Sequence, residues 1–129
     1  MSTASKNAAG ITPVPFGTFY RSASTSSGVN VSETSITTID VTDMTEAVLL
    51  VNATSIGTTA TLTIKVYQLD QAGARYPDAA IISRAITSAS KTRDTIATPL
   101  GNKLEITYTI TGQTGGTTTF IAELQLKAR

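Results

Sequence analysis

Acidic side chains are the first groups in this chain that could bind or transform a ligand. Asp40, Asp43 and Glu46 lie close together in the sequence, and Asp70 and Asp78 flank one loop. Ca²⁺ prefers carboxylate oxygens of this kind, but the chain has no twelve-residue calcium loop between helices. Asp also stabilises turns by accepting hydrogen bonds from nearby backbone N–H groups. We favour this turn chemistry and predict no metal site.

The chain has few side chains that could act in nucleophilic or acid–base catalysis. The chain has no His and no Cys, which excludes His-based triads, Cys–His pairs and Cys/His zinc sites. Ser5-Lys6 and Ser90-Lys91 lie in polar stretches, whereas a Ser–Lys nucleophile needs a buried Lys of low pKa. Paired carboxylates can hydrolyse glycosides, but such enzymes use a cleft with aromatic platforms, and this chain has no Trp. We therefore predict a non-enzymatic protein with no catalytic residue and no cofactor.

Length and charge narrow the class of protein further. The 129 residues suit one domain, with or without a tail. Ten basic and nine acidic residues give a net charge of +1, and the basic residues are scattered, whereas nucleic-acid binders gather them on one face. No stretch approaches the roughly 18 apolar residues that a membrane span needs, and residues 1–10 lack the apolar run of a signal peptide. We expect no nucleic-acid partner, no membrane, and synthesis in a cytoplasm that the protein leaves by lysis or inside an assembly.

Composition and periodicity favour β structure. The chain contains 25 Thr and 12 Ser, and the β-branched Thr prefers extended backbone. Segments 60–69, 103–111 and 117–127 alternate apolar and polar residues with the period of a half-buried strand, and 47–51 is a continuous apolar run that suits a central strand. Turn signals separate about seven or eight such segments. We predict an all-β fold, an antiparallel β-sandwich of jelly-roll or Ig-like type, over residues 31–129.

Two local predictions concern the connections in this fold. The glycine-rich segment 112–116 predicts a tight turn, and we expect the strands on either side of it, 103–111 and 117–127, to pair as a hairpin. Residues 88–94 are polar and read as a loop, so the short strand that follows is placed at 95–100.

Residues 1–30 differ in composition from the rest and form a predicted N-terminal arm. Two Pro residues stand among apolar ones in Ile11-Thr-Pro-Val-Pro-Phe-Gly17, which favours an extended path. Segment 22–28 is almost entirely Ser, Thr and Gly, as in a flexible linker. One interpretation is a disordered N-terminus; the other is an extended arm that lies on a neighbouring subunit, because aromatic residues this dense usually have a partner surface. The anchors of that arm would be Phe16, Phe19 and Tyr20.

Five segments carry strand and turn patterns that are shared with a known group of proteins. They are Asp40–Asn52, Thr61–Tyr67, Asp70–Tyr76, Pro99–Gly112 and Thr117–Lys127. Over the stretch 40–127 that contains these segments, about two-thirds of the chain, it resembles small virion-structural proteins of tailed bacteriophages and prophages, of the kind often encoded near the major capsid protein. In those proteins the loop often carries a Trp-Tyr pair, where this chain has Arg75-Tyr76. The resemblance implies a β-sandwich that coats or cements a capsid, or forms a related virion part, and carries over no catalytic residue.

The expected function follows from this resemblance together with the absence of catalytic groups. We expect a capsid decoration or cement protein on the virion surface, made in the host bacterial cytoplasm. Its partners would be the major capsid protein and copies of itself, in a homo-oligomer such as a trimer. A tail or neck component with the same sandwich is one alternative. A glycan- or host-surface-binding module is another, with Arg75 and Tyr76 in the surface-binding loop.

Overall fold

The computed structural model describes residues 19–42, 44–96 and 101–128, and its regular structure in these ranges is β-strand. The eight strands, in chain order, are β1 (Phe19–Ser27), β2 (Val31–Asp40), β3 (Met44–Ser55), β4 (Thr61–Leu69), β5 (Ile82–Ile86), β6 (Ser90–Ile96), β7 (Lys103–Thr111) and β8 (Thr118–Ala128). None of the described ranges contains a helix that is long and apolar enough to cross a membrane.

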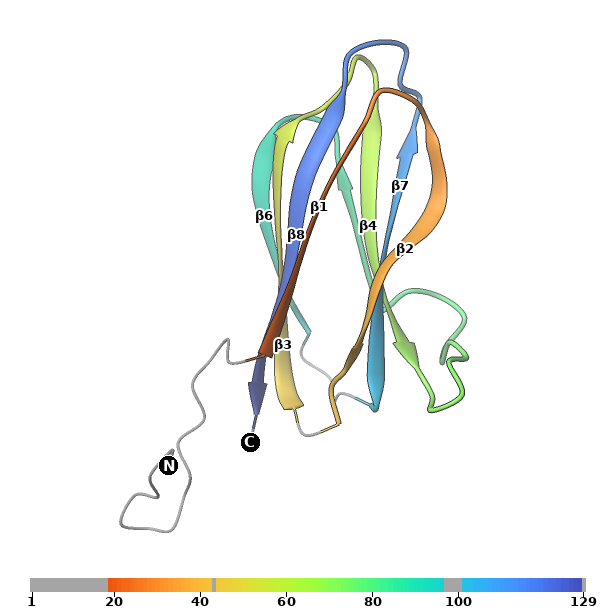
Figure 1. Ribbon diagram of the computed structural model, residues 1–129, viewed down its shortest axis with the longest axis vertical. Coiled ribbons are helices and arrows are strands. Elements are labelled where there is room, and N and C mark those ends of the chain that lie inside the picture. Colours follow the sequence, from red (N-terminus) through yellow and green to blue (C-terminus); the bar gives the residue numbers. More distant parts are fainter. Residues whose placement is uncertain (1–18, 43, 97–100, 129) are drawn as a thin grey trace, which may run out of the picture.

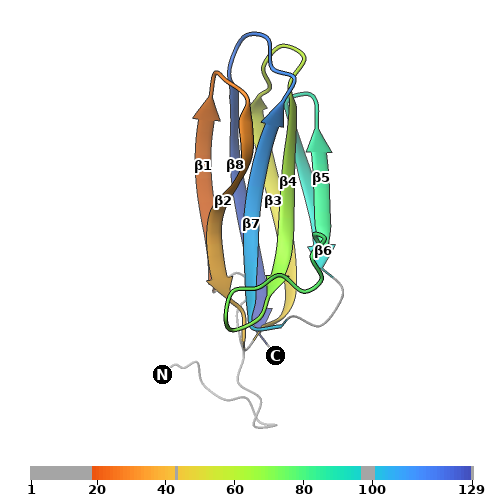
Figure 2. The same cartoon turned by 90° about the vertical axis from the view of Figure 1, so that its right-hand side faces the viewer.

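The strands form two four-stranded antiparallel sheets that lie face to face (Figures 1 and 2). Sheet A has the strand order β1-β8-β3-β6, and sheet B has the order β2-β7-β4-β5. Every connection except that from β4 to β5 passes from one sheet to the other. This is the arrangement of an eight-stranded jelly roll. The predicted antiparallel β-sandwich is therefore confirmed, and of the two predicted types the jelly roll is observed.

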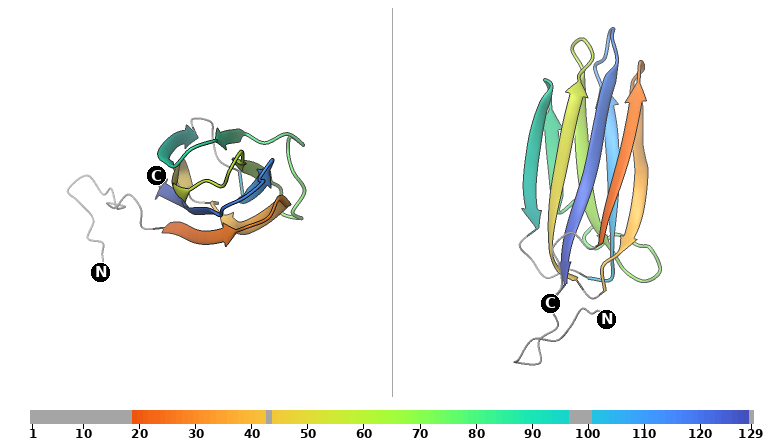
Figure 3. Two further views of the ribbon diagram at one scale, coloured as in Figure 1. Left: turned by 90° about the horizontal axis from the view of Figure 1, so that it is seen from above. Right: turned by 60° about the vertical axis from the view of Figure 1, so that its left-hand side comes forward.

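The view from above shows the two sheets facing each other (Figure 3), and the side chains buried in the core are mostly aliphatic. β8 illustrates how the sequence builds it: Phe120, Ala122, Leu124 and Leu126 are all buried, at the alternate positions that a strand turns to one face. Phe120 is the largest fully buried side chain, and its ring centre lies 5.4 Å from that of Tyr108 on the opposite sheet. The alternation of apolar and polar residues predicted for segment 117–127 is thus confirmed.

The predicted hairpin of the last two strands is wrong. β7 lies in sheet B between β2 and β4, whereas β8 lies in sheet A between β1 and β3. The glycine-rich connection does turn sharply, because Gly112 and Gly116 adopt φ angles of 71° and 72°, a region that favours glycine. However, this connection leads from sheet B to sheet A. The apolar faces of β7 and β8 therefore cover the core from opposite sides.

Two segments that the sequence placed in a linker and a loop are strands. Residues 22–27 belong to β1, whose backbone pairs with β8 along its whole length without a register shift. Residues 90–94 belong to β6, which begins five residues before the predicted strand at 95–100. Both are edge strands of sheet A. An edge strand exposes one long side to water, so Ser, Thr and charged residues occupy positions where a central strand would be apolar.

The connections β1–β2, β3–β4 and β7–β8 lie at one end of the sandwich, the upper end in Figure 1, and hydrogen bonds of Gln113 and Thr118 link them. Gln113 Nε2 donates to Ser27 O at 3.1 Å, and Gln113 Oε1 accepts from Thr118 Oγ1 at 2.6 Å. The backbone N–H of Gly57 donates to the same Thr118 Oγ1 at 2.9 Å. A Cβ atom on Gly57 would collide with the Gln113 side chain and would lie 2.8 Å from the backbone O of Gly115, so glycine is favoured there. We call Ser27, Gly57, Gln113 and Thr118 the Gln113 network.

Candidate functional site

The carboxylates that could have been metal ligands stabilise turns instead. Asp40 Oδ1 accepts hydrogen bonds from the Thr42 hydroxyl at 2.6 Å and the Thr42 backbone N at 2.9 Å, and these bonds lower the pKa of Asp40. Asp70 Oδ1 accepts from the backbone N of Ala74 at 2.8 Å. Asp43 lies outside the described residues. Within the described part of the chain, no three His, Cys, Asp or Glu residues gather as metal ligands. The turn chemistry predicted from the sequence is therefore the observed role of Asp40 and Asp70.

Arg75, the first residue of the predicted surface-binding pair, lies against the outer face of sheet B. Its guanidinium carbon is 3.6 Å from the centre of the Tyr67 ring, and its Nε donates to Glu105 Oε1 at 3.1 Å. Glu33 Oε2 accepts from Tyr67 Oη at 2.5 Å and from Thr107 Oγ1 at 2.7 Å. We call these five residues the Glu33 cluster. Arg75 thereby fastens its loop to the sheet and is engaged within its own chain.

The hydrogen bonds of this cluster change the acidity of two of its members. The Tyr67 hydroxyl, followed by the Thr107 hydroxyl, holds the pKa of Glu33 below its ordinary value. Desolvation and the hydrogen bond to Glu33 raise the pKa of Tyr67. Glu33 is thus an ionised acceptor at neutral pH, and Tyr67 is a neutral donor.

Tyr76, the second residue of the pair, is 61% exposed. Its backbone N–H donates to Gln68 O at 2.9 Å, which fixes the loop beside β4. Tyr76 lines a hollow of about 440 Å³ together with Gln68, Asp70 and Asn102. An exposed aromatic ring beside amide and carboxylate groups offers both an apolar face and hydrogen-bonding partners to a ligand.

The three predicted anchors of the arm are only partly covered by the structure. Phe16 lies outside the described residues, as do residues 1–18 as a whole. Phe19 and Tyr20 are the first residues of β1, where their backbone pairs with Leu126 and Gln125 of β8. Sheet A therefore includes the backbone of two of the three anchors. Their contact with a neighbouring subunit stays a prediction.

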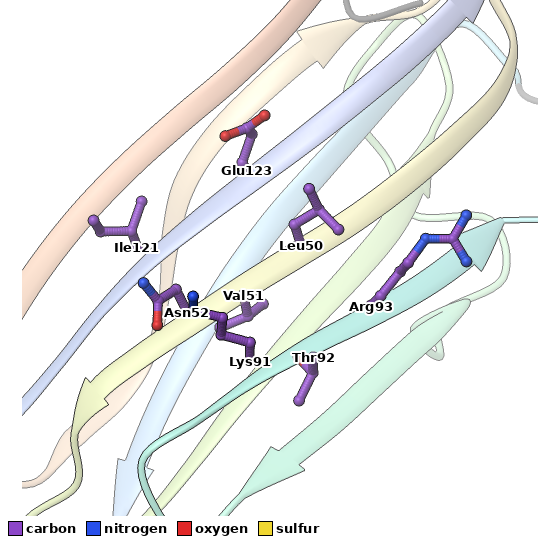
Figure 4. Close-up of a pocket in the computed structure, with 8 residues that line it drawn as sticks. All are labelled: Leu50, Val51, Asn52, Lys91, Thr92, Arg93, Ile121 and Glu123. Carbon is purple, nitrogen blue, oxygen red and sulfur yellow. The ribbon is translucent and has the colours of Figure 1, made fainter.

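The outer face of sheet A carries a groove that the sequence analysis did not predict. It has a volume of about 450 Å³ and runs across β8, β3 and β6. Its outward side chains are Ile121 and Glu123 from β8, Leu50 and Asn52 from β3, and Lys91 and Arg93 from β6 (Figure 4). We call it the sheet A groove.

The sheet A groove combines an apolar middle with charged sides. Leu50 is half-buried, Ile121 is 39% exposed, and Val48 of the same face is buried. Lys91 and Arg93 are exposed on the β6 side. Such a surface suits contact with another surface of matching shape and charge. Two signals in the sequence could have revealed it: Leu50 takes an outward position within the apolar run 47–51, and Ile121 is an apolar residue among the polar outward positions of β8.

Comparison with known proteins adds information on the fold. No protein-family model matches the sequence, and no curated protein sequence matches it. Similar solved structures include that of PirA, with 12% identity and a TM-score of 0.52 over 81% of this chain and 92% of that chain. A chain from the disulfide-linked pili of Bacillus endospore appendages has 12% identity and a TM-score of 0.49 over 100% of this chain and 98% of its own.

A third similar structure is the VP2 subviral particle of infectious bursal disease virus, with 10% identity and a TM-score of 0.49 over 87% of this chain and 34% of that chain. At identities this low, only a shared fold is meaningful, and among these three only PirA exceeds a TM-score of 0.5. Because one fold serves many functions, the function has to be argued from the surface of this chain.

Proposed function

We propose that this protein is a non-enzymatic structural subunit of a bacteriophage particle that acts by presenting its surface to neighbouring proteins. The sheet A groove is the observation that carries this proposal, because a sheet face with Leu50 and Ile121 at its centre suits burial against another protein. In its finer form the proposal is a head decoration or cement protein on the capsid surface. Its partners would be the major capsid protein and other copies of the chain. The phage assignment draws on the sequence resemblance over residues 40–127.

A decoration protein needs a rigid scaffold and a contact that can be repeated. The two-sheet core and the Gln113 network supply a scaffold whose end loops are fastened together. An interface of about 1,600 Å² is enough for specific binding, and repetition over a symmetric particle multiplies it. The net charge of +1 leaves little long-range repulsion between neighbouring copies.

The test is to purify particles and to count copies of this protein in each by quantitative mass spectrometry. Hundreds of copies would support a capsid coat, and about a dozen or fewer would support the alternative of a neck or tail component. Absence from the particles would refute the structural role altogether.

A second experiment asks which surface attaches the protein. Leu50→Asp places a charge in the sheet A groove, and Thr63→Asp places one at a half-buried position on the outer face of sheet B as a matched control. We expect Leu50→Asp to reduce binding to particles that lack the protein and Thr63→Asp to leave it unchanged. A third variant, with residues 2–17 deleted, retains β1 and tests the predicted arm. Full binding by the deletion variant would show that residues 2–17, which include the anchor Phe16, are dispensable.

The hollow beside Tyr76 favours a second candidate function, which is binding of a saccharide on a host surface. Glycan sites use an aromatic ring with neighbouring hydrogen-bonding groups, and Tyr76 with Asp70 and Asn102 has this composition. Glycan-array binding that is lost in Tyr76→Ala but retained in Val29→Ala, which truncates another exposed apolar residue, would support this function. No binding by the wild-type protein would refute it.

A further inference from the structure

The strand registers arrange the side chains of the sheet A groove in rows across the strands. Leu50 of β3 pairs with Glu123 of β8 on one side and with Arg93 of β6 on the other. In the next row, Asn52 of β3 pairs with Ile121 of β8 on one side and with Lys91 of β6 on the other. Figure 4 shows Leu50 between Glu123 and Arg93. One row therefore reads acidic, apolar and basic from β8 to β6.

The charges at the two ends of this row are not neutralised by ion pairs within the described part of the chain. Glu123 Oε2 accepts a hydrogen bond from Gln125 Nε2 at 2.8 Å, and the ion pairs of the described residues join other side chains. Adjacent strands lie about 4.8 Å apart, so the backbones that carry Glu123 and Arg93 are separated by about 10 Å, with Leu50 between them. A partner surface could therefore satisfy both charges only by presenting a basic group over β8 and an acidic group over β6.

We propose that a second copy of this chain supplies that surface, packed face to face on the sheet A groove about a two-fold axis parallel to the strands. This rotation places β8 of one copy over β6 of the other. Glu123 then faces Arg93 of the partner subunit, and Arg93 faces Glu123 of the partner subunit. Leu50 lies near the axis and meets Leu50 of the partner subunit. The contact uses the same patch on both copies, as an isologous dimer interface does.

The charge pattern selects both the direction of the axis and the occupant. An axis perpendicular to the strands would place β8 over β8, so that Glu123 would face its own counterpart and like charges would repel. Segment 11–17 of the chain is apolar and uncharged, so it could cover Leu50 and Ile121 but would leave Glu123 and Arg93 without partners. A second copy places Leu50 against Leu50 of the partner subunit and gives both Glu123 and Arg93 a partner of opposite charge.

This contact rests on the proposed function and assigns the sheet A groove to one of the two partners named there, a second copy of the chain, and it is tested in solution without particles. A protein that fails to enter particles could still form this dimer, and a monomeric protein could still bind a capsid. The two proposals can therefore fail independently.

Charge reversal gives the sharper of two tests. Glu123→Arg and Arg93→Glu, made singly, each create two like-charge contacts per dimer, and we expect each to raise the dimer dissociation constant at least about 100-fold in sedimentation equilibrium. An equimolar mixture of the two variants should associate again, because every contact in the mixed dimer joins opposite charges. Asp78→Arg, in the exposed loop that precedes β5, is the control and should associate as the wild type does.

Site-directed cross-linking tests the position of the axis. The chain has no Cys, so Leu50→Cys introduces a single thiol near the axis. A short thiol-specific cross-linker should join two such chains into a species of twice the monomer mass. Thr95→Cys, exposed on β6 but displaced from the axis, should react much more slowly.

Three outcomes would overturn the dimer. The first is a wild-type protein that stays monomeric at millimolar concentration. The second is association that survives both single charge reversals. The third is association that is lost on deletion of residues 2–17 but unaffected by reversal, which would assign the groove to that segment.

Discussion

Truncating Gln113 to Ala is expected to weaken the whole sandwich, because the Gln113 network joins three connections that are distant in the sequence. The side chain makes two hydrogen bonds, one to Ser27 O and one from Thr118 Oγ1. The bond to the half-buried Ser27 contributes about 1 kcal/mol, the net value of a typical intramolecular hydrogen bond. Thr118 is fully buried, so its hydroxyl loses its only acceptor in the network, which costs about 1–3 kcal/mol.

The predicted loss for Gln113→Ala is therefore about 2–4 kcal/mol of unfolding free energy. Urea denaturation followed by circular dichroism measures it by linear extrapolation. Gln71→Ala is the matched control, because Gln71 is an exposed loop residue whose backbone oxygen, not its side chain, accepts a hydrogen bond. It should stay within about 0.5 kcal/mol of the wild type.

A double-mutant cycle with Thr118→Val tests the physical cause. If the loss of unfolding free energy comes from the Thr118 hydroxyl left without an acceptor, the loss caused by Gln113→Ala should be at least about 1 kcal/mol smaller in the Thr118→Val background. A Gln113→Ala loss below about 0.5 kcal/mol, or additive effects in the cycle, would refute the reasoning.

Two further predictions concern the Glu33 cluster and the core. Because the folded-state pKa of Glu33 is lowered, its ionised form stabilises the fold above its ordinary pKa near 4.5, and this contribution is lost as the pH falls through the lowered value. Glu33→Gln should therefore be less stable than wild type at pH 7, and the difference should shrink when unfolding is repeated at pH 3; an unchanged difference would contradict the assignment. Phe120→Ala should cost about 3–5 kcal/mol by the same denaturation assay, with Phe120→Leu less harmful, whereas the exposed Tyr76→Ala should change stability by less than about 0.5 kcal/mol. Equal losses for Phe120→Ala and Tyr76→Ala would contradict the burial pattern.

The sequence predicted the fold class because the central strands carry strong alternation. Segments 60–69 and 117–127 became β4 and β8 with the predicted alternation of apolar and polar residues. Residues 22–27 of β1 and 90–94 of β6 were not predicted as strand for a physical reason. Both strands are edges of sheet A and pair along one side only, so they tolerate Ser, Thr and charged residues. Periodicity also could not show that β7 and β8 belong to different sheets, because a strand alternates in the same way whichever neighbour it pairs with.

The candidate sites were less predictable than the fold, because they depend on contacts between distant segments. Tyr67 lies on the outer face of β4, but Arg75 and Glu33 cover it so that only 4% is exposed. The sheet A groove depends on the register between three strands, which places Glu123 and Arg93 on either side of Leu50. No pattern within one strand encodes that register.

The place of β8 in sheet A has a consequence for how the protein is made. β8 is synthesised after the other seven strands, yet it lies between β1 and β3, and Phe19 pairs with Leu126. On the ribosome, the nascent chain can therefore pair β4 with β5 and β3 with β6. The apolar run 47–51 in β3 stays unpaired on its other side until β8 has been synthesised. Such late, long-range pairing makes folding slow and leaves hydrophobic strands open to aggregation until translation of β8 is complete. Chaperone dependence during expression is the expected cost of this topology.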